Sequence, residues 1–62
     1  MTLHQYVTKL RMDEAMRQIT TTQVAIKDIA ASIGYPDPFH FSRIFKNHFD
    51  MPPSDVKRKP TL

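Results

Sequence analysis

The sequence has 62 residues, which is enough for one small domain at most. It contains no cysteine, which excludes disulfide bonds and thiolate metal sites, and no apolar run approaches the ~20 residues of a membrane-spanning helix. The formal net charge of +3 and the sequence pI of about 9.6 permit an anionic partner without requiring one.

The first predicted helix covers residues 3–19. Thr2 and Gln5 have the spacing of a capping box, which favours a helix start at Leu3. Its apolar residues form two sets that point to different sides of the helix: Leu3, Tyr6, Val7 and Leu10, then Met12, Ala15, Met16 and Ile19. Either this helix is half buried in its own domain, or a further partner covers part of it. The threonine run at 20–22 is expected to end the helix, because β-branched and hydroxyl side chains favour turns.

The second predicted helix covers residues 25–33. Four apolar residues recur at the spacing of one helical face: Ile26, Ile29, Ala30 and Ile33. Gly34, the only glycine of the chain, follows directly, where a helix end favours a residue that tolerates positive φ. Tyr35 is expected to pack into the core beneath this turn.

The third predicted helix covers residues 38–48 and begins with Asp37 as N-cap and Pro38 at the first helical position. Its two sides differ in chemistry. The side expected to be buried carries Phe41, Ile44, Phe45 and Phe49, and the other side carries Phe39, Ser42, Arg43, Lys46 and Asn47. A short last helix is predicted over 53–58, after the proline pair at 52–53.

Two helices joined by a sharp turn have two interpretations. The pair is either a helix-turn-helix that places its second helix in the DNA major groove, or a plain helical hairpin whose polar side is only solvated.

The residues of this hairpin resemble a known family. The chain has Ile29-Ala30, then Gly34-Tyr35, then the run Phe41-Ser42-Arg43 with Phe45-Lys46 behind it, and then Pro53-Ser54. This order is similar to the second helix-turn-helix of AraC/XylS-type bacterial transcription regulators. The resemblance covers residues 3–58 and implies an all-α, homeodomain-like arrangement: a long linker helix, a helix-turn-helix and a short last helix. It also implies that residues 1–62 are one DNA-binding module from a longer regulator.

The candidate base-contacting residues lie near the start of the third helix, where groove-entering helices first meet base edges. They are Pro38, Phe39, Ser42 and Arg43. Arg43 is the strongest candidate because a guanidinium matches guanine O6 and N7, although an ion pair with Asp50 is an alternative. The candidate phosphate-contacting residues are Lys46, Asn47, Ser54 and Lys57.

Two positions differ from the residue that the family often has there. Phe39 stands where the family often has serine, so its role does not carry over, and it either contacts a thymine methyl or folds back onto the hairpin. His40 stands where the family often has tyrosine and is expected to pack at the edge of the core.

The predicted function is therefore sequence-specific binding of double-stranded DNA by a cytoplasmic bacterial regulator. The resemblance implies an upstream helix-turn-helix as a further partner and contact with RNA polymerase. The alternative is a helical protein-interaction module that self-associates through the apolar residues of its first helix. No enzyme, cofactor or metal site is predicted, because no catalytic motif is present and the three histidines are widely spaced.

Overall fold

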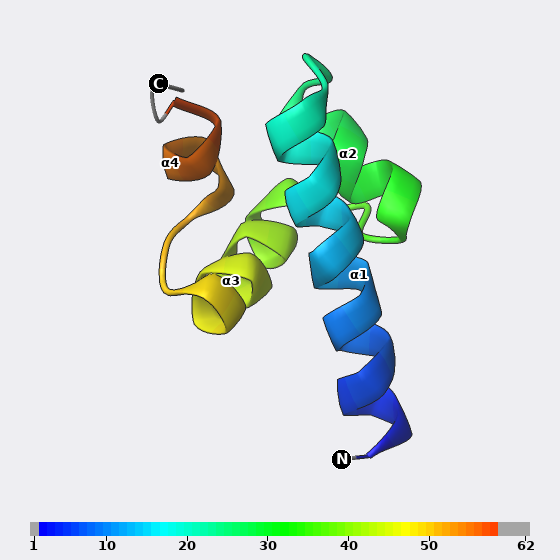
Figure 1. The fold of residues 1–62 in the computed structure, drawn as a ribbon. Coiled ribbons are helices and arrows are strands. Elements are labelled where there is room, and N and C mark those ends of the chain that lie inside the picture. Colours follow the sequence, from blue (N-terminus) through cyan, green and yellow to red (C-terminus); the bar gives the residue numbers. More distant parts are fainter. Residues whose placement is uncertain (1, 59–62) are drawn as a thin grey trace.

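The computed structural model describes residues 2–58, and within this range the chain is all-α, as predicted. Its four helices are α1 (Leu3–Thr21), α2 (Ile26–Ile33), α3 (Pro38–Phe49) and α4 (Pro53–Arg58). Figure 1 shows α1 as a long rod, with the other three helices gathered around its C-terminal half. No helix in the described range is long and apolar enough to span a bilayer.

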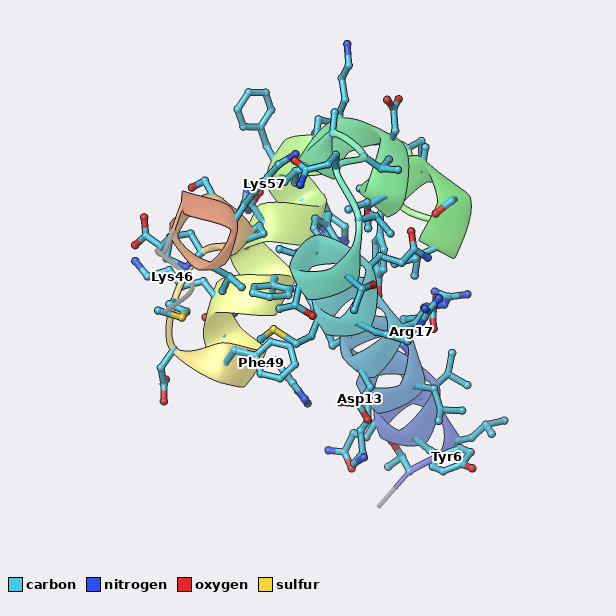
Figure 2. All side chains as sticks on the ribbon, turned by 45° about the horizontal axis from the view of Figure 1, so that its top comes forward. Tyr6, Asp13, Arg17, Lys46, Phe49 and Lys57 are labelled. Carbon is cyan, nitrogen blue, oxygen red and sulfur yellow. The ribbon has the colours of Figure 1, made fainter. Side chains whose placement is uncertain are left out.

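The start of α1 is fixed by the predicted capping box. The Gln5 N–H donates to Thr2 Oγ1 at 3.1 Å, and the Thr2 N–H donates to Gln5 Oε1 at 3.0 Å. The two apolar sets of this helix differ in their exposure to solvent. Met12, Ala15 and Ile19 are buried, whereas Leu3, Tyr6 and Leu10 are 79%, 51% and 49% exposed. The N-terminal half of α1 therefore extends beyond the core, where Tyr6 is labelled in Figure 2.

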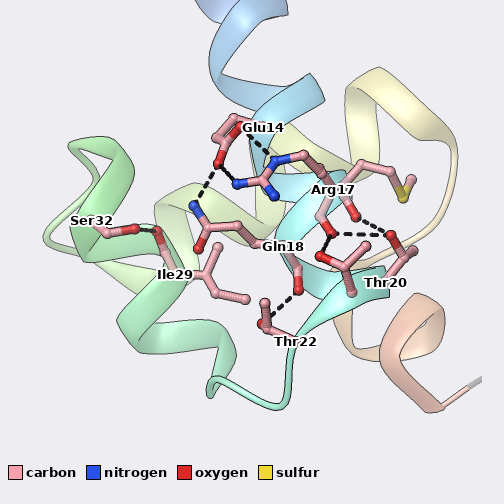
Figure 3. Close-up of polar contacts among 9 residues, drawn as sticks. Glu14, Arg17, Gln18, Thr20, Thr22, Ile29 and Ser32 are labelled. Atoms are coloured by element: carbon pink, nitrogen blue, oxygen red, sulfur yellow. Dashed lines mark hydrogen bonds and ion pairs between the residues drawn. The ribbon is translucent and has the colours of Figure 1, made fainter.

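The end of α1 corrects the sequence prediction. The helix continues through Thr20 and Thr21 instead of ending at Ile19. The Thr20 hydroxyl donates to the Met16 carbonyl at 2.9 Å, and the Thr21 hydroxyl donates to the carbonyl one residue further along (Figure 3). The side chains thus bond to carbonyls of the preceding turn while the backbone stays helical.

α2 begins one residue later than expected, with Ala25 as its N-cap. The turn that follows it, between α2 and α3, has the predicted caps. Gly34 has φ +111°, and the next N–H, that of Tyr35, donates to the Ala30 carbonyl at 2.9 Å. Asp37 Oδ1 then accepts from the Phe39 N–H at 3.0 Å and caps α3.

Aromatic rings anchor the inner side of α3. Phe41 and Phe45 are fully buried, and Tyr35 is 7% exposed, as expected for a core residue. Successive ring centroids lie 5.8 Å apart from Tyr35 to Phe41, 5.8 Å from Phe41 to Phe45 and 4.7 Å from Phe45 to Phe49. These are ordinary aromatic packing distances, so the row of rings fixes how α3 is rotated about its axis. The helix ends at Phe49, one residue later than predicted, with Asp50 as its C-cap.

Candidate nucleic-acid interface

The outer face of α3 is defined here as the four residues at helical offsets 0, 3, 4 and 7 from its first turn: Phe39, Ser42, Arg43 and Lys46. Three of them are exposed and Ser42 is half-buried. Because the inner side of α3 is held by the row of rings, the outer face is turned away from the core. The short helix, the tight turn and this second helix have the geometry of a helix-turn-helix.

Arg43 is exposed on the outer face. Neither of the ion pairs seen on α1, Lys9 with Asp13 and Glu14 with Arg17, involves its guanidinium, and no ion pair joins it to another side chain described by the structure. The alternative contact with Asp50 is therefore not formed. Its five N–H donors face solvent and match the acceptors of a base edge or a phosphate.

The first turn of α3 exposes an aromatic ring. Phe39 is 78% exposed, and Pro38 beside it is half-buried. Of the two alternatives for Phe39, folding back onto the hairpin is thus excluded by the structure.

The predicted phosphate-contacting residues are distributed over two helices. Lys46 and Asn47 are exposed near the end of α3, and Ser54 is exposed on α4. Figure 2 shows Lys46 on the opposite side of the molecule from Tyr6 at the free end of α1. The candidate interface and the exposed end of α1 are therefore separate surfaces.

Lys57 has a structural contact that the sequence did not indicate. Its ammonium donates to the Val24 carbonyl at 2.9 Å and ties α4 to the linker between α1 and α2. An ammonium has three donors, so this bond leaves two protons for a phosphate. The sequence-predicted role and the structural one are compatible.

Two further side chains support the turn. The exposed His40 ring lies 5.9 Å from the Tyr35 ring, in agreement with the expected packing role at the edge of the core. The Arg11 guanidinium carbon lies 5.5 Å from the centroid of the same Tyr35 ring. It also lies 3.8 Å from the position that a Cβ on Gly34 would occupy. Sequence reasoning missed this contact of Arg11, because its partners lie in the turn between α2 and α3 and no local spacing connects them to α1.

The described part of the chain has two surface hollows, both away from the outer face of α3. Residues 2–58 contain no group of three or more potential metal-ligating His, Cys, Asp or Glu side chains. A hollow of about 220 Å³ lies between the end of α1 and α4, and one of about 400 Å³ lies beside His4 and His48. Neither is lined by a residue of the outer face of α3.

This arrangement defines a helix-turn-helix domain, and comparison with known proteins gives its family. The helix-turn-helix domain family matches residues 1–59. The chain therefore belongs to this family, as a member of the AraC/XylS type, a class of DNA-binding transcription regulators.

Several curated regulators are similar to the chain. YesN of Bacillus subtilis, an uncharacterized transcriptional regulatory protein, is 40% identical over 89% of the chain and 16% of its own length. The transcriptional activator RhaS of Yersinia pestis is 37% identical over 92% of the chain and 21% of its own length. The regulatory protein SoxS of Salmonella typhimurium is 38% identical over 94% of the chain and 54% of its own length. These relatives are regulators, which agrees with the prediction that the chain is not an enzyme.

A solved structure shares the fold. The C-terminal domain of the response regulator yesN from Fusobacterium nucleatum superposes with a TM-score of 0.90, at 24% identity, over 94% of the chain and 56% of that domain. The chain spans between 16% and 54% of the length of the curated relatives described above.

Proposed function

We propose that this chain binds double-stranded DNA sequence-specifically by placing α3 in the major groove, as one module of a longer bacterial transcription regulator. The observation that carries the proposal is the division of α3 into a buried aromatic side and an exposed outer face. Arg43 supplies a fork of donors for guanine, and Ser42 a hydroxyl for a base edge or a phosphate. Because DNA is the partner, the expected location is the bacterial cytoplasm.

The phosphate contacts would come from the second half of α3 and from α4. Lys46 and Asn47 lie farther along α3, and Ser54 and Lys57 are exposed on α4. Such contacts fix the position of the helix and carry no sequence information. A single module with so few phosphate contacts is expected to bind weakly and with a shallow salt dependence.

The test is fluorescence anisotropy with labelled duplexes selected from a random pool by the 62-residue chain. Arg43→Ala is expected to cost about 1–3 kcal/mol and to relax base choice at one position. Lys46→Ala is expected to weaken all duplexes alike and to reduce the salt slope by about 1. Lys9→Ala is the matched control, because it removes one charge on α1, away from the outer face of α3. Equal effects of the three substitutions would contradict the proposal.

The exposed apolar residues on the first half of α1 favour a second candidate function. Leu3, Tyr6 and Leu10 lie at offsets 0, 3 and 7 and are about half or more exposed. Such a stripe suits a helical partner, whether a second copy or an upstream helix-turn-helix. Sedimentation of the chain against Leu3→Ser/Leu10→Ser tests self-association. NMR shifts on DNA addition that map only to residues 3–19 would favour this function over DNA binding.

A further inference from the structure

Phe39 differs sharply from the other phenylalanines of α3. It is 78% exposed, whereas Phe41 and Phe45 are 0% exposed and Phe49 is half-buried. It lies in the first turn, three and four residues before Ser42 and Arg43, on the same outer face. A phenyl ring at this place has no hydrogen bond to offer to a base, so any selectivity that it confers must come from apolar contact.

The backbone of Phe39 is held firmly. Its N–H donates to Asp37 Oδ1 at 3.0 Å, and Pro38 precedes it at the first helical position. Only the two side-chain torsions of a phenylalanine then remain to be ordered on binding, which is a small entropic cost for a large contact area. The Cα of Phe39 is therefore held at a fixed place on the leading turn of α3, from which the ring projects into solvent.

The major groove offers one apolar group among its base edges, the C5 methyl of thymine. We infer that Phe39 selects a pyrimidine that carries a C5 methyl, so that this chain reads thymine, and equally 5-methylcytosine, at one position next to the base read by Arg43. The inference rests on the proposed function, because Phe39 reaches a C5 methyl only when α3 lies in the major groove.

The experiment removes the methyl group from the DNA. In a duplex selected by the chain, each thymine is replaced singly by deoxyuridine, which keeps the base pair and loses only the methyl. Burial of one methyl group against a ring corresponds to about a three- to fivefold change in affinity. At one position the wild-type chain is expected to lose about this factor. Replacing that thymine–adenine pair by 5-methylcytosine–guanine is expected to preserve more affinity than replacing it by cytosine–guanine.

Substitutions of Phe39 test whether its phenyl ring causes the preference for the C5 methyl. Phe39→Ala is expected to bind the thymine and deoxyuridine duplexes equally, and Phe39→Leu to retain part of the preference. Arg43→Ala, the matched control on the same face, is expected to bind more weakly but to keep the preference for the methyl. Thermal unfolding checks that each variant is folded.

The outcomes separate the two proposals. If the wild-type chain binds with a dependence on Arg43 but no deoxyuridine substitution affects affinity, the Phe39 inference fails alone. Loss of the methyl preference in Arg43→Ala but not in Phe39→Ala would also overturn it. If no duplex is bound at low salt, both the inference and the proposed function fail.

Discussion

The Arg11 guanidinium carbon lies 5.5 Å from the centroid of the Tyr35 ring, so a cation on α1 covers a residue of the turn between α2 and α3. A cation above a tyrosine ring at an exposed site stabilises by about 0.5–1 kcal/mol. Arg11→Ala is therefore expected to lower the free energy of unfolding by about this amount in urea denaturation. Arg11→Met, which keeps the aliphatic stem without the charge, separates stem packing from the cation–π contact. A double-mutant cycle with Tyr35→Leu that gives no coupling would contradict the assignment.

Asp50 is held in an unfavourable conformation at the end of α3. It is the only non-glycine residue with positive φ in the described range, at +65°, and its carboxylate stands at the negative end of the helix dipole. Asp50→Gly is expected to raise the free energy of unfolding by about 0.5–1 kcal/mol, and Asp50→Asn by a few tenths. Lys46→Gly, inside the same helix, is the control and is expected to lower it by about 0.5–1 kcal/mol. Equal effects of the two glycine substitutions would show that Asp50 is not strained.

Phe39 and Phe41 stand two positions apart with opposite environments. Phe41→Ala removes a fully buried ring, which costs about 3–5 kcal/mol and is comparable to the whole stability of a domain of this size. This variant is expected to be unfolded at 25 °C by circular dichroism. Phe41→Leu, which retains most of the volume, is expected to fold with a loss of about 1–1.5 kcal/mol. Phe39→Ala is expected to change stability by less than about 0.5 kcal/mol, and a larger loss would mean that the ring packs on the protein.

Glu14 is expected to make the folding stability depend weakly on pH in the acid range. The Arg17 side chain donates to its carboxylate at 3.0 Å, Gln18 also donates, and these bonds lower the pKa of Glu14 from 4.5 to about 2 (Figure 3). A carboxyl with a lowered pKa in the folded state stabilises above its unfolded pKa, and this contribution is lost as pH falls from 4.5 toward 2. The effect is expected to be small and sensitive to salt, because the pair is exposed.

The measurement for Glu14 is an NMR titration of its carboxyl carbon, with thermal unfolding at several pH values. Arg17→Gln is expected to move the pKa of Glu14 back toward 4.5. Glu14→Gln is expected to flatten the dependence of the melting temperature on pH in the acid range. A Glu14 pKa that does not respond to Arg17→Gln would exclude the ion pair as its cause.

Local signals predicted much of this fold. Thr2, Gly34 and Asp37 act within one turn of their own position, so their capping roles could be read from spacing alone. The buried side of α3 followed from helical periodicity in the same way. The end of α1 could not be predicted from propensity, because the threonine hydroxyls bond back to carbonyls of the helix that they were expected to end.

Contacts between a helix and a distant connecting segment could not be predicted from sequence patterns. The bond from Lys57 to the Val24 carbonyl joins residues 33 positions apart, and the Arg11–Tyr35 contact joins α1 to the turn. Both depend on how the helices pack. Periodicity placed Phe39 on the outer face, but only the packed structure excludes its return onto the hairpin.

The position of α1 relative to the core determines which part of the domain unfolds locally. Its buried residues all lie at or beyond Met12, and the turns before them are held by the capping box and the Lys9–Asp13 ion pair. An isolated helix of that length is marginal in water, so these first turns can fray while the rest stays folded. Amide protons before Lys9 should therefore exchange with solvent quickly, and the amide of Ala15 should exchange only when the whole domain opens. An upstream partner that covered Leu3 and Tyr6 would slow the first group and leave the second unchanged.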